Sequence, residues 1–323
     1  MSLTTKHALL EVSALSVTLG SKTSATTILK EVSFKLERGR TLGIVGESGC
    51  GKSMTALALM GLLPDEASVS GRVVFDGMDL TNLTTQQWQA VRGPRIAMVF
   101  QEPMTALNPV MTVGRQLAEM LLVHEGASSA SARVRAIELL GRVGIADPHS
   151  RVDAYPHQLS GGMRQRVMIA MALACKPDLL IADEPTTALD VSIEAQILDL
   201  LLELQQQEGM ALLLISHNLA VVSEMADDML VMYAGEVVES GPLQHVLTQP
   251  RHPYTQGLMA SIPSMKHARK ILPTIHGTVP NLKFRPSGCA FAPRCERAQE
   301  RCRTEAVTLH AIDSQHCVAC VLA

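Results

Sequence analysis

The sequence lacks an apolar run long enough to cross a membrane. The longest one, Val167 to Cys175, is about half of the ~20 residues that a spanning helix needs. The first residues, MSLTTKHALLEVSALSV, also lack the basic stretch, apolar stretch and small-residue cleavage site of a secretory signal. These absences argue against an integral membrane protein and against an exported one, so we expect a cytoplasmic protein.

What the sequence does contain is unevenly distributed. The 323 residues are 47% hydrophobic, enough for a packed core. Residues 246–323 carry 10 Lys and Arg against 4 Asp and Glu, and seven of the 16 prolines, whereas the residues before them carry 18 against 27. Five of the seven cysteines fall in the last 35 residues. We therefore expect a boundary near Pro250 and an irregular segment after it.

Before this boundary, short apolar stretches alternate with helical patterns, which is typical of a mostly parallel α/β sheet. The expected hairpin, residues 229–241, turns at Ala234-Gly235, and residues 111–145 predict a helical insertion. Strands covered on both faces are expected at 41–46, 95–100, 179–183 and 211–216, and helices at 53–63, 160–174 and 191–207.

The stretch GESGCGKS fits the pattern G-x-x-x-x-G-K-[ST] between an expected strand and an expected helix. Its glycines let backbone N–H groups surround a polyphosphate, and the helix N-terminus adds partial positive charge. Lys52 would reach the β- and γ-phosphates and Ser53 would ligate Mg²⁺. The expected phosphate contacts are Gly46, Ser48, Gly49, Gly51, Lys52 and Ser53.

Two further motifs suit the same chemistry. LLIADEP ends a strand in adjacent carboxylates, so Asp183 would bind Mg²⁺ and Glu184 would activate water. LSGGMRQR opens a helix with a Ser-Gly-Gly turn, a second cluster of phosphate-binding donors. Because the chain has only one lysine-bearing loop, a head-to-tail dimer explains this turn, which would close over the partner's nucleotide.

In this order, and with ISHN after them, the motifs resemble the ATP-binding subunits of ABC transporters over residues 8–245. The resemblance implies that Gln101 senses Mg²⁺ and the membrane partner, that Asp190 belongs to the D-loop and that His217 is the switch histidine. It also implies that Ser160, Gly161 and Gly162 meet the γ-phosphate of ATP across the dimer. One position departs from the family, since Leu19 stands where an aromatic residue usually stacks on adenine.

The resemblance implies an α/β fold, the P-loop ATPase domain of ABC transporters. Such a domain has a mixed-sheet core, an antiparallel β subdomain and a helical subdomain. We expect this domain at residues 1–249, with the helical subdomain at about 102–165, and an irregular cysteine-containing extension at 250–323.

Within the family, FQEPMTALNP and RHPYTQGLM are similar to the dipeptide, oligopeptide and nickel importers. This implies an ATP-hydrolysing importer subunit, peripheral at the cytoplasmic face of the cell membrane. Its partners would be a second, homologous ATPase, two permeases and an extracytoplasmic binding protein, without nucleic acid. Which solute is transported stays open, because its pocket belongs to other chains.

The cysteines of GCAFAPRCERAQERC fit neither a common zinc ribbon nor a c-type haem motif. Some relatives with this tail bind a [4Fe–4S] cluster, which implies Cys289, Cys295, Cys302 and Cys320 as ligands and Cys317 as a spare. Zinc and unliganded thiols are the alternatives. Four nearby arginines would offset the negative charge of such a site: Arg294, Arg297, Arg301 and Arg303.

Two other function classes are weighed against the importer. A soluble ABC-type ATPase of DNA repair or translation usually has two fused halves or a long coiled coil, whereas this chain has one phosphate loop and no long heptad run. A non-hydrolysing module is disfavoured by a full set of catalytic residues: Lys52, Asp183, Glu184 and His217.

Overall fold

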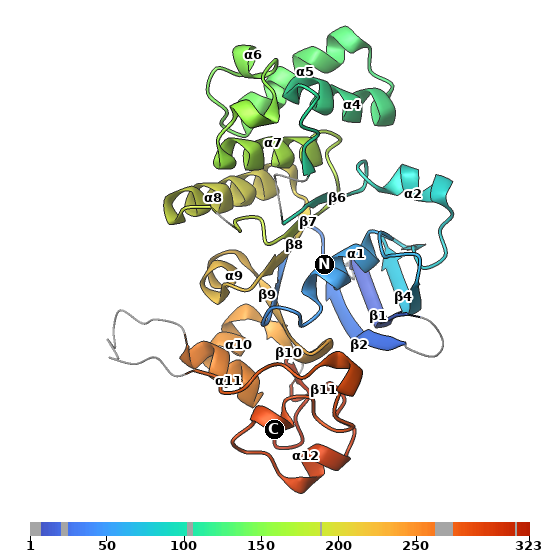
Figure 1. Ribbon diagram of the computed structural model, residues 1–323, viewed down its shortest axis with the longest axis vertical. Helices are drawn as coiled ribbons and strands as arrows, with labels where there is room; N and C mark the ends of the chain where they lie inside the picture. The colour runs from blue at the N-terminus through green and yellow to red at the C-terminus, as the bar shows by residue number, and fades with distance from the viewer. Residues whose placement is uncertain (1–7, 21–24, 102–105, 188, 262–273, 314) are drawn as a thin grey trace, which may run out of the picture. The chain divides into compact units, whose positions relative to one another are not determined.

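The computed structural model divides into two compact units, Met1–Asn82 with Leu214–Ala323, and Leu83–Leu213 (Figure 1). It describes residues 8–20, 25–101, 106–187, 189–261, 274–313 and 315–323. Residues 102–105, where the helical subdomain was expected to begin, and Ala188 of the ALD motif lie outside this part. Among the described helices, none is long and apolar enough to cross a bilayer.

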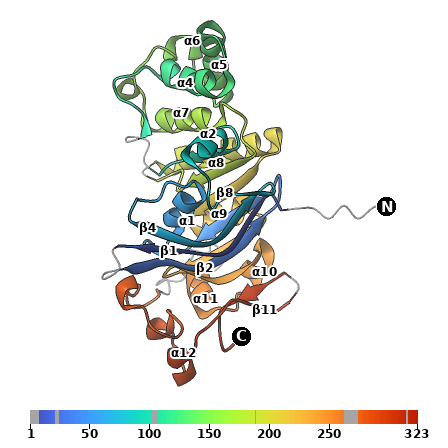
Figure 2. The ribbon, with the colours of Figure 1, turned by 90° about the vertical axis from the view of Figure 1, so that its right-hand side faces the viewer.

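The first unit contains a four-stranded antiparallel sheet in the order β2-β1-β4-β5 (Figure 2). Buried and exposed side chains alternate along its strands: β-branched and apolar side chains are buried on one face, while serine, lysine and glutamate face outward. This sheet is the antiparallel subdomain that the resemblance implied. The bounds are β1 Leu10–Leu19, β2 Thr26–Leu36, β4 Ala67–Phe75 and β5 Met78–Asp79.

The second sheet of this unit contains the strand order β11-β12-β10-β9-β3. Strand β3 (Thr41–Val45) pairs in parallel with β9 (Asp228–Tyr233), and all five residues of β3 are buried, as expected for a strand covered on both faces. The helices of this unit include α1 Lys52–Leu59, α9 Leu219–Met225, α10 Leu243–Thr248 and α11 Pro253–Ala260, of which α9 contacts β3 and α10 contacts β9 and β10.

Strands β9 and β10 (Glu236–Pro242) form the predicted hairpin. Ala234 and Gly235 have φ of 48° and 82°, the positive pair that a two-residue hairpin turn uses. A Cβ at Gly235 would lie 1.9 Å from the carbonyl oxygen of Ile28, so glycine is required there both by φ and by space.

The C-terminal extension is mostly irregular, but part of it joins the sheet. Strand β12 (Cys317–Val318) pairs antiparallel with β10, and β11 (His310–Ala311) pairs with β12. Two residues per strand are too few for an alternating pattern, so this continuation of the sheet could not be predicted from local sequence. The remaining elements are η2 Leu282–Phe284, η3 Ala292–Arg294 and α12 Glu300–Thr304. The boundary at Pro250 stays a prediction.

The second unit combines parallel strands with helices. Strand β6 (Ile96–Val99) pairs in parallel with β7 (Leu179–Asp183), and β8 (Ala211–Ser216) crosses the border between the units. Helix α7 contacts both α4 and α5, which form the predicted helical insertion. The helices are α2 Thr85–Val91, α4 Val113–Glu125, α5 Ser129–Arg142, α6 Pro148–Arg151, η1 Pro156–Gln158, α7 Gly161–Leu173 and α8 Val191–Glu208.

Candidate nucleotide-binding site

The phosphate loop follows β3 and ends at the first turn of α1. Lys52 begins this helix, is buried, and donates from Nζ to the carbonyl oxygens of Gly46 at 2.8 Å and Glu47 at 3.2 Å. A Cβ at Gly46 would lie 2.3 Å from the carbonyl oxygen of Met232, so backbone from β9 approaches the loop closely. The loop is thus curled around its own lysine, with Ser48 and Gly49 exposed at its tip.

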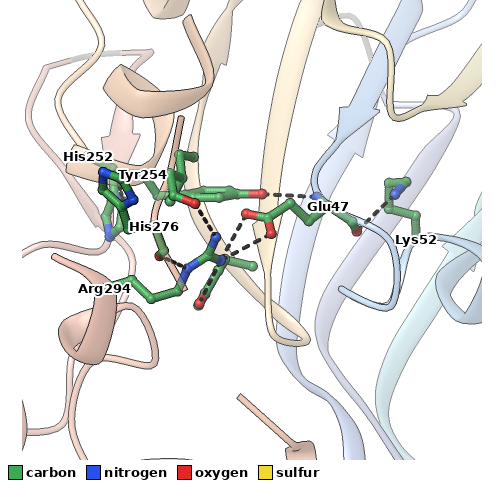
Figure 3. A network of polar contacts seen from close by, with 8 residues as sticks. Glu47, Lys52, His252, Tyr254, His276 and Arg294 are labelled. Atoms are coloured by element: carbon green, nitrogen blue, oxygen red, sulfur yellow. Dashed lines mark hydrogen bonds and ion pairs between the residues drawn. The ribbon is translucent and has the colours of Figure 1, made fainter. Parts of the chain in front are cut away.

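The second residue of the loop is held by side chains from beyond Pro250 (Figure 3). The backbone N–H of Glu47 donates to Tyr254 Oη at 2.9 Å. Its carboxylate accepts from Arg294 Nη1 at 3.0 and 3.1 Å. No role was predicted for Glu47 or Tyr254, and Arg294 was expected to act beside the cysteines. Pairs separated by 207 and 247 residues leave no local pattern from which they could have been predicted.

The carboxylates of LLIADEP lie at the end of β7, where Asp183 is buried. Glu184 follows with φ of 46°, a left-handed conformation that non-glycine residues rarely adopt. Its Oε2 accepts from Gln101 Nε2 at 3.2 Å and from Thr187 Oγ1 at 3.0 Å. Gln101 and Glu184, which are 83 residues apart, are therefore brought into direct contact within the second unit.

The Ser-Gly-Gly turn forms the start of α7, as the motif predicted. Ser160 is the N-cap and accepts from the N–H of Met163 at 3.3 Å, while Gly161 begins the helix. Ser160 and Gly161 are exposed, and Gly162 is half-buried. Asp190 is the N-cap of α8 and is also exposed. These groups thus lie at helix N-termini where they are accessible to a ligand or a partner.

The remaining predicted site residues are divided between the units. Lys52, Ser53, Leu19 and His217 belong to the first unit, and Asp183, Glu184, Gln101, Ser160 and Asp190 to the second. His217 directly follows β8 and is exposed. Leu19 is half-buried at the end of β1, where it pairs with Thr26 and Ala67.

Four of the tail cysteines line a single small pocket. Its lining consists of Cys289, Cys295, Cys302 and Cys320 together with His252, Pro253, Phe291, Ala292, Val321 and Leu322. Backbone N–H groups of Gln299 and Leu322 donate to the sulfur atoms of Cys302 and Cys320, each at 3.4 Å. Cys317 lies instead in β12.

The thiols of this pocket are in an apolar environment. Burial raises the pKa of Cys289 to about 11 and also raises that of Cys295. Burial lowers the pKa of His252 to about 4, so its imidazole is neutral. Its Nδ1 accepts from the N–H of Tyr254 at 3.1 Å, and its buried Nε2 has no hydrogen-bond partner among the described residues.

The metal site of the tail and the role of its arginines stay predictions, and two observations bear on them. Across the described ranges, no three His, Cys, Asp or Glu side chains are arranged as a metal site. Arg294, expected to offset charge at the cysteines, is bonded to Glu47, and Arg301 donates to the carbonyl of Val321. Burial is the largest effect on the pKa of Cys295 and raises it, whereas the backbone N–H and the charge of Arg297 lower it, in the expected sense.

Comparison with known families gives two matches along the chain. Residues 29–187 match the ABC transporter family, and residues 238–302 match the C-terminal region of oligopeptide/dipeptide transporters. Among solved structures, the dimeric ATP-binding cassette MJ0796 in a post-hydrolysis state with ADP and Pi has a TM-score of 0.65 and 29% identity, covering 72% of this chain and 98% of that one. The cassette cbiO1 of Clostridium perfringens has a TM-score of 0.64 and 29% identity, covering 75% and 91%.

Curated relatives match over nearly the whole length. The dipeptide transport ATP-binding protein DppD of Escherichia coli K12 is 51% identical over 304 residues, 94% of this chain and 93% of the relative. A probable peptide ABC transporter ATP-binding protein, y4tR of Sinorhizobium fredii, is 50% identical over 315 residues, 97% and 94%. The chain therefore belongs to the ABC transporter family and is one of its ATP-binding, ATP-hydrolysing importer subunits.

Proposed function

We propose that this ATPase powers the import of peptides, with dipeptides as the first candidates. The support is the match of residues 238–302 to the C-terminal region of oligopeptide/dipeptide transporters and the names of the relatives, which are dipeptide and peptide transport proteins. The alternative, an ABC-type ATPase not coupled to transport, is not favoured because that C-terminal region would have no place in it.

We propose ATP and Mg²⁺ as the ligands of these motifs. The loop N–H groups and Lys52 suit a polyphosphate, and three oxygen donors suit Mg²⁺: the Ser53 hydroxyl, the Gln101 amide and the Asp183 carboxylate. The bound cation would neutralise charge developing on the phosphates. The contact of Gln101 and Thr187 with Glu184 is the observation that carries our assignment of Glu184 as the general base, because it orients the carboxylate.

The base assignment is tested by Glu184→Gln, which keeps the shape of the side chain but removes its basicity. We expect ATP binding to be retained and steady-state hydrolysis to fall by about 10²–10⁴-fold, the usual contribution of a positioned base. Glu203→Gln on the exposed face of α8 is the matched control and should change turnover little. Hydrolysis by Glu184→Gln within about threefold of wild type would exclude this role.

We propose further that the catalytic site is completed by a second, homologous ATPase. Ser160, Gly161, Gly162 and Asp190 would contact the partner's nucleotide, while His217 would serve the γ-phosphate. The exposure of Ser160, Gly161, Asp190 and His217, the partial exposure of Gly162, and the dimeric state named for the solved cassette MJ0796 support this. The isolated chain should hydrolyse ATP poorly. Full activity of a strictly monomeric preparation, with no increase on adding the partner ATPase and permeases, would refute the composite site.

The expected assembly contains two permeases and an extracytoplasmic binding protein, with this chain peripheral at the cytoplasmic face and no nucleic acid. Uptake of labelled dipeptide by cells lacking this chain, complemented with wild type or with Lys52→Ala, tests the substrate and the coupling together. We expect uptake only with wild type. Uptake that is restored by Lys52→Ala, or that never depended on the chain, would overturn the proposal.

The cysteine pocket is proposed as the site of a sulfur-ligated group, either a [4Fe–4S] cluster or zinc. Convergence of Cys289, Cys295, Cys302 and Cys320 on one pocket and the N–H donors to two of their sulfur atoms support it. The unpartnered Nε2 of His252 would supply one more donor to sulfur. Metal–thiolate bonds would add the stabilisation that an irregular, proline-rich segment lacks.

Protein purified without oxygen separates the possibilities. A brown preparation with about four iron and four sulfide per chain supports the cluster, and a colourless one with stoichiometric zinc supports zinc. A preparation without metal would leave these cysteines as unliganded thiols. Cys295→Ser should lose the bound metal, whereas Cys317→Ser, outside the pocket, should keep it.

A further inference from the structure

Two residues of the C-terminal extension, one of them on α11, hold the phosphate loop at Glu47. Tyr254, on α11, accepts from the Glu47 backbone N–H at 2.9 Å, and Arg294, at the end of η3, donates to both carboxylate oxygens at 3.0 and 3.1 Å (Figure 3). The main chain and the side chain of this loop residue are thus both fixed by partners more than 200 residues away.

The two holding groups are themselves tightly constrained. Tyr254 is fully buried, with its ring centroid 4.7 Å from that of Tyr233 and 5.4 Å from that of Phe291. Such a packed ring has little freedom to follow the loop if the loop moves.

Arg294 is constrained by hydrogen bonds. Its side chain is 5% exposed, and it donates from Nε to the carbonyl of His276 at 2.9 Å and from Nη2 to that of Ile275 at 3.2 Å. Its Nη1 also lies 3.3 Å from Tyr233 Oη. The planar guanidinium therefore faces Glu47 in one fixed orientation, which an ammonium group could not reproduce.

The position of Glu47 matters for the phosphate site because the residue is part of the curl around Lys52. The Glu47 carbonyl accepts from Lys52 Nζ at 3.2 Å while its N–H points to Tyr254. Fixing both peptide groups of this residue sets the path of the backbone whose later N–H groups would face the nucleotide. A loop that is already ordered loses less entropy on binding, so its ligand binds more tightly.

We propose that Arg294 and Tyr254 are positioning residues for the phosphate loop, through which the C-terminal extension sets the affinity of this subunit for ATP. The proposal rests on the proposed role of residues 46–53 in binding nucleotide. If it is correct, a segment outside the ATPase motifs contributes to the affinity for ATP.

The test is the Kd of a fluorescent ATP analogue with Mg²⁺ for the purified full-length chain, well below its thermal midpoint. Arg294→Gln, which removes the charge-assisted pair with Glu47, should weaken binding about tenfold, and Tyr254→Phe, which removes one hydrogen bond to the loop, about fivefold. Arg303→Gln, an exposed arginine of the same extension, is the control and should stay within about twofold. Tyr254→Phe keeps the packed ring, so it remains informative if Arg294→Gln folds poorly.

A double-mutant cycle of Arg294 with Glu47 distinguishes an effect on the position of the loop from a general loss of stability. Glu47→Gln and Arg294→Gln should weaken binding by similar factors, and the double variant should be no weaker than either single one, because they remove the same contact. If the Arg294→Gln and Tyr254→Phe variants are folded and bind the ATP analogue within about twofold of wild type, the positioning proposal is wrong, while the assignment of the phosphate loop stands. A wild-type chain without ATP binding would overturn the loop assignment and the proposal with it.

Discussion

One buried carboxylate ties the extension to the sheet, and its removal is a direct test of that attachment. Glu239 of β10 is 0% exposed. It accepts from the N–H of Arg251 at 2.7 Å, from the N–H of His252 at 2.9 Å and from His316 Nε2 at 2.8 Å. Glu239→Gln keeps the volume but replaces one acceptor oxygen by an NH₂ group that faces a donor.

The loss of stability comes from a buried hydrogen-bond donor that Glu239→Gln leaves without an acceptor. A hydrogen bond to a buried charged group contributes roughly 1.5–3 kcal/mol, and an orphaned buried donor costs a further ~1–3 kcal/mol. We therefore expect Glu239→Gln to lower the free energy of unfolding by about 3–5 kcal/mol, a large part of the ~5–15 kcal/mol typical of a folded protein. Urea unfolding followed by circular dichroism measures this change directly.

Hydrogen exchange would locate the effect, since the amides of β11 and β12 should lose protection first. The matched control is Glu11→Gln, whose partner Lys35 lies across an exposed strand pair, with an expected loss of about 0–1 kcal/mol. If Glu239→Gln and Glu11→Gln lower the unfolding free energy equally, the buried carboxylate does not anchor the extension.

Two further predictions concern local geometry and pH. Gly235→Ala should destabilise clearly more than Gly77→Ala, because both have φ near 80° but only at Gly235 would the new Cβ meet backbone, as thermal midpoints would show. The hydrogen bond from Arg135 lowers the pKa of Glu125 below its ordinary 4.5, so the pair stabilises above that pH and loses its effect as pH falls through the lower folded value. Glu125→Gln should therefore cost about 0.5 kcal/mol at pH 7 and nothing near pH 2, and an equal cost at both would contradict the assignment.

Local patterns were sufficient to predict the buried strands and one hairpin. The apolar runs at 41–46, 179–183 and 211–216 became β3, β7 and β8, each wholly buried, because a strand covered on both faces needs apolar side chains throughout. The Ala234-Gly235 turn was predictable for a similar reason, since positive φ restricts the choice of residue.

The attachment of the extension was not predictable in this way. Strand β12 is two residues long, so it carries no period, and its pairing depends on Glu239, a charged residue inside a strand. A buried carboxylate in β10 is explained only when its three donors are known, and one of them, His316, lies 77 residues further along the chain. The charge and proline content of residues 246–323 indicated a change of structure, but not the contacts that return it to the sheet.

The contacts of the phosphate loop with the extension were likewise not predictable from local sequence. The pattern GESGCGKS specifies the groups that face a phosphate, yet it leaves Glu47 undetermined, because that side chain points away from the lysine toward Arg294. In this chain Glu47 is the loop residue that Tyr254 and Arg294 of the extension hold. Since Arg294 directly precedes Cys295, the turn that contacts the loop is also the turn that lines the cysteine pocket. The two features that sequence analysis treated separately, the phosphate loop and the tail cysteines, are therefore joined by one buried arginine.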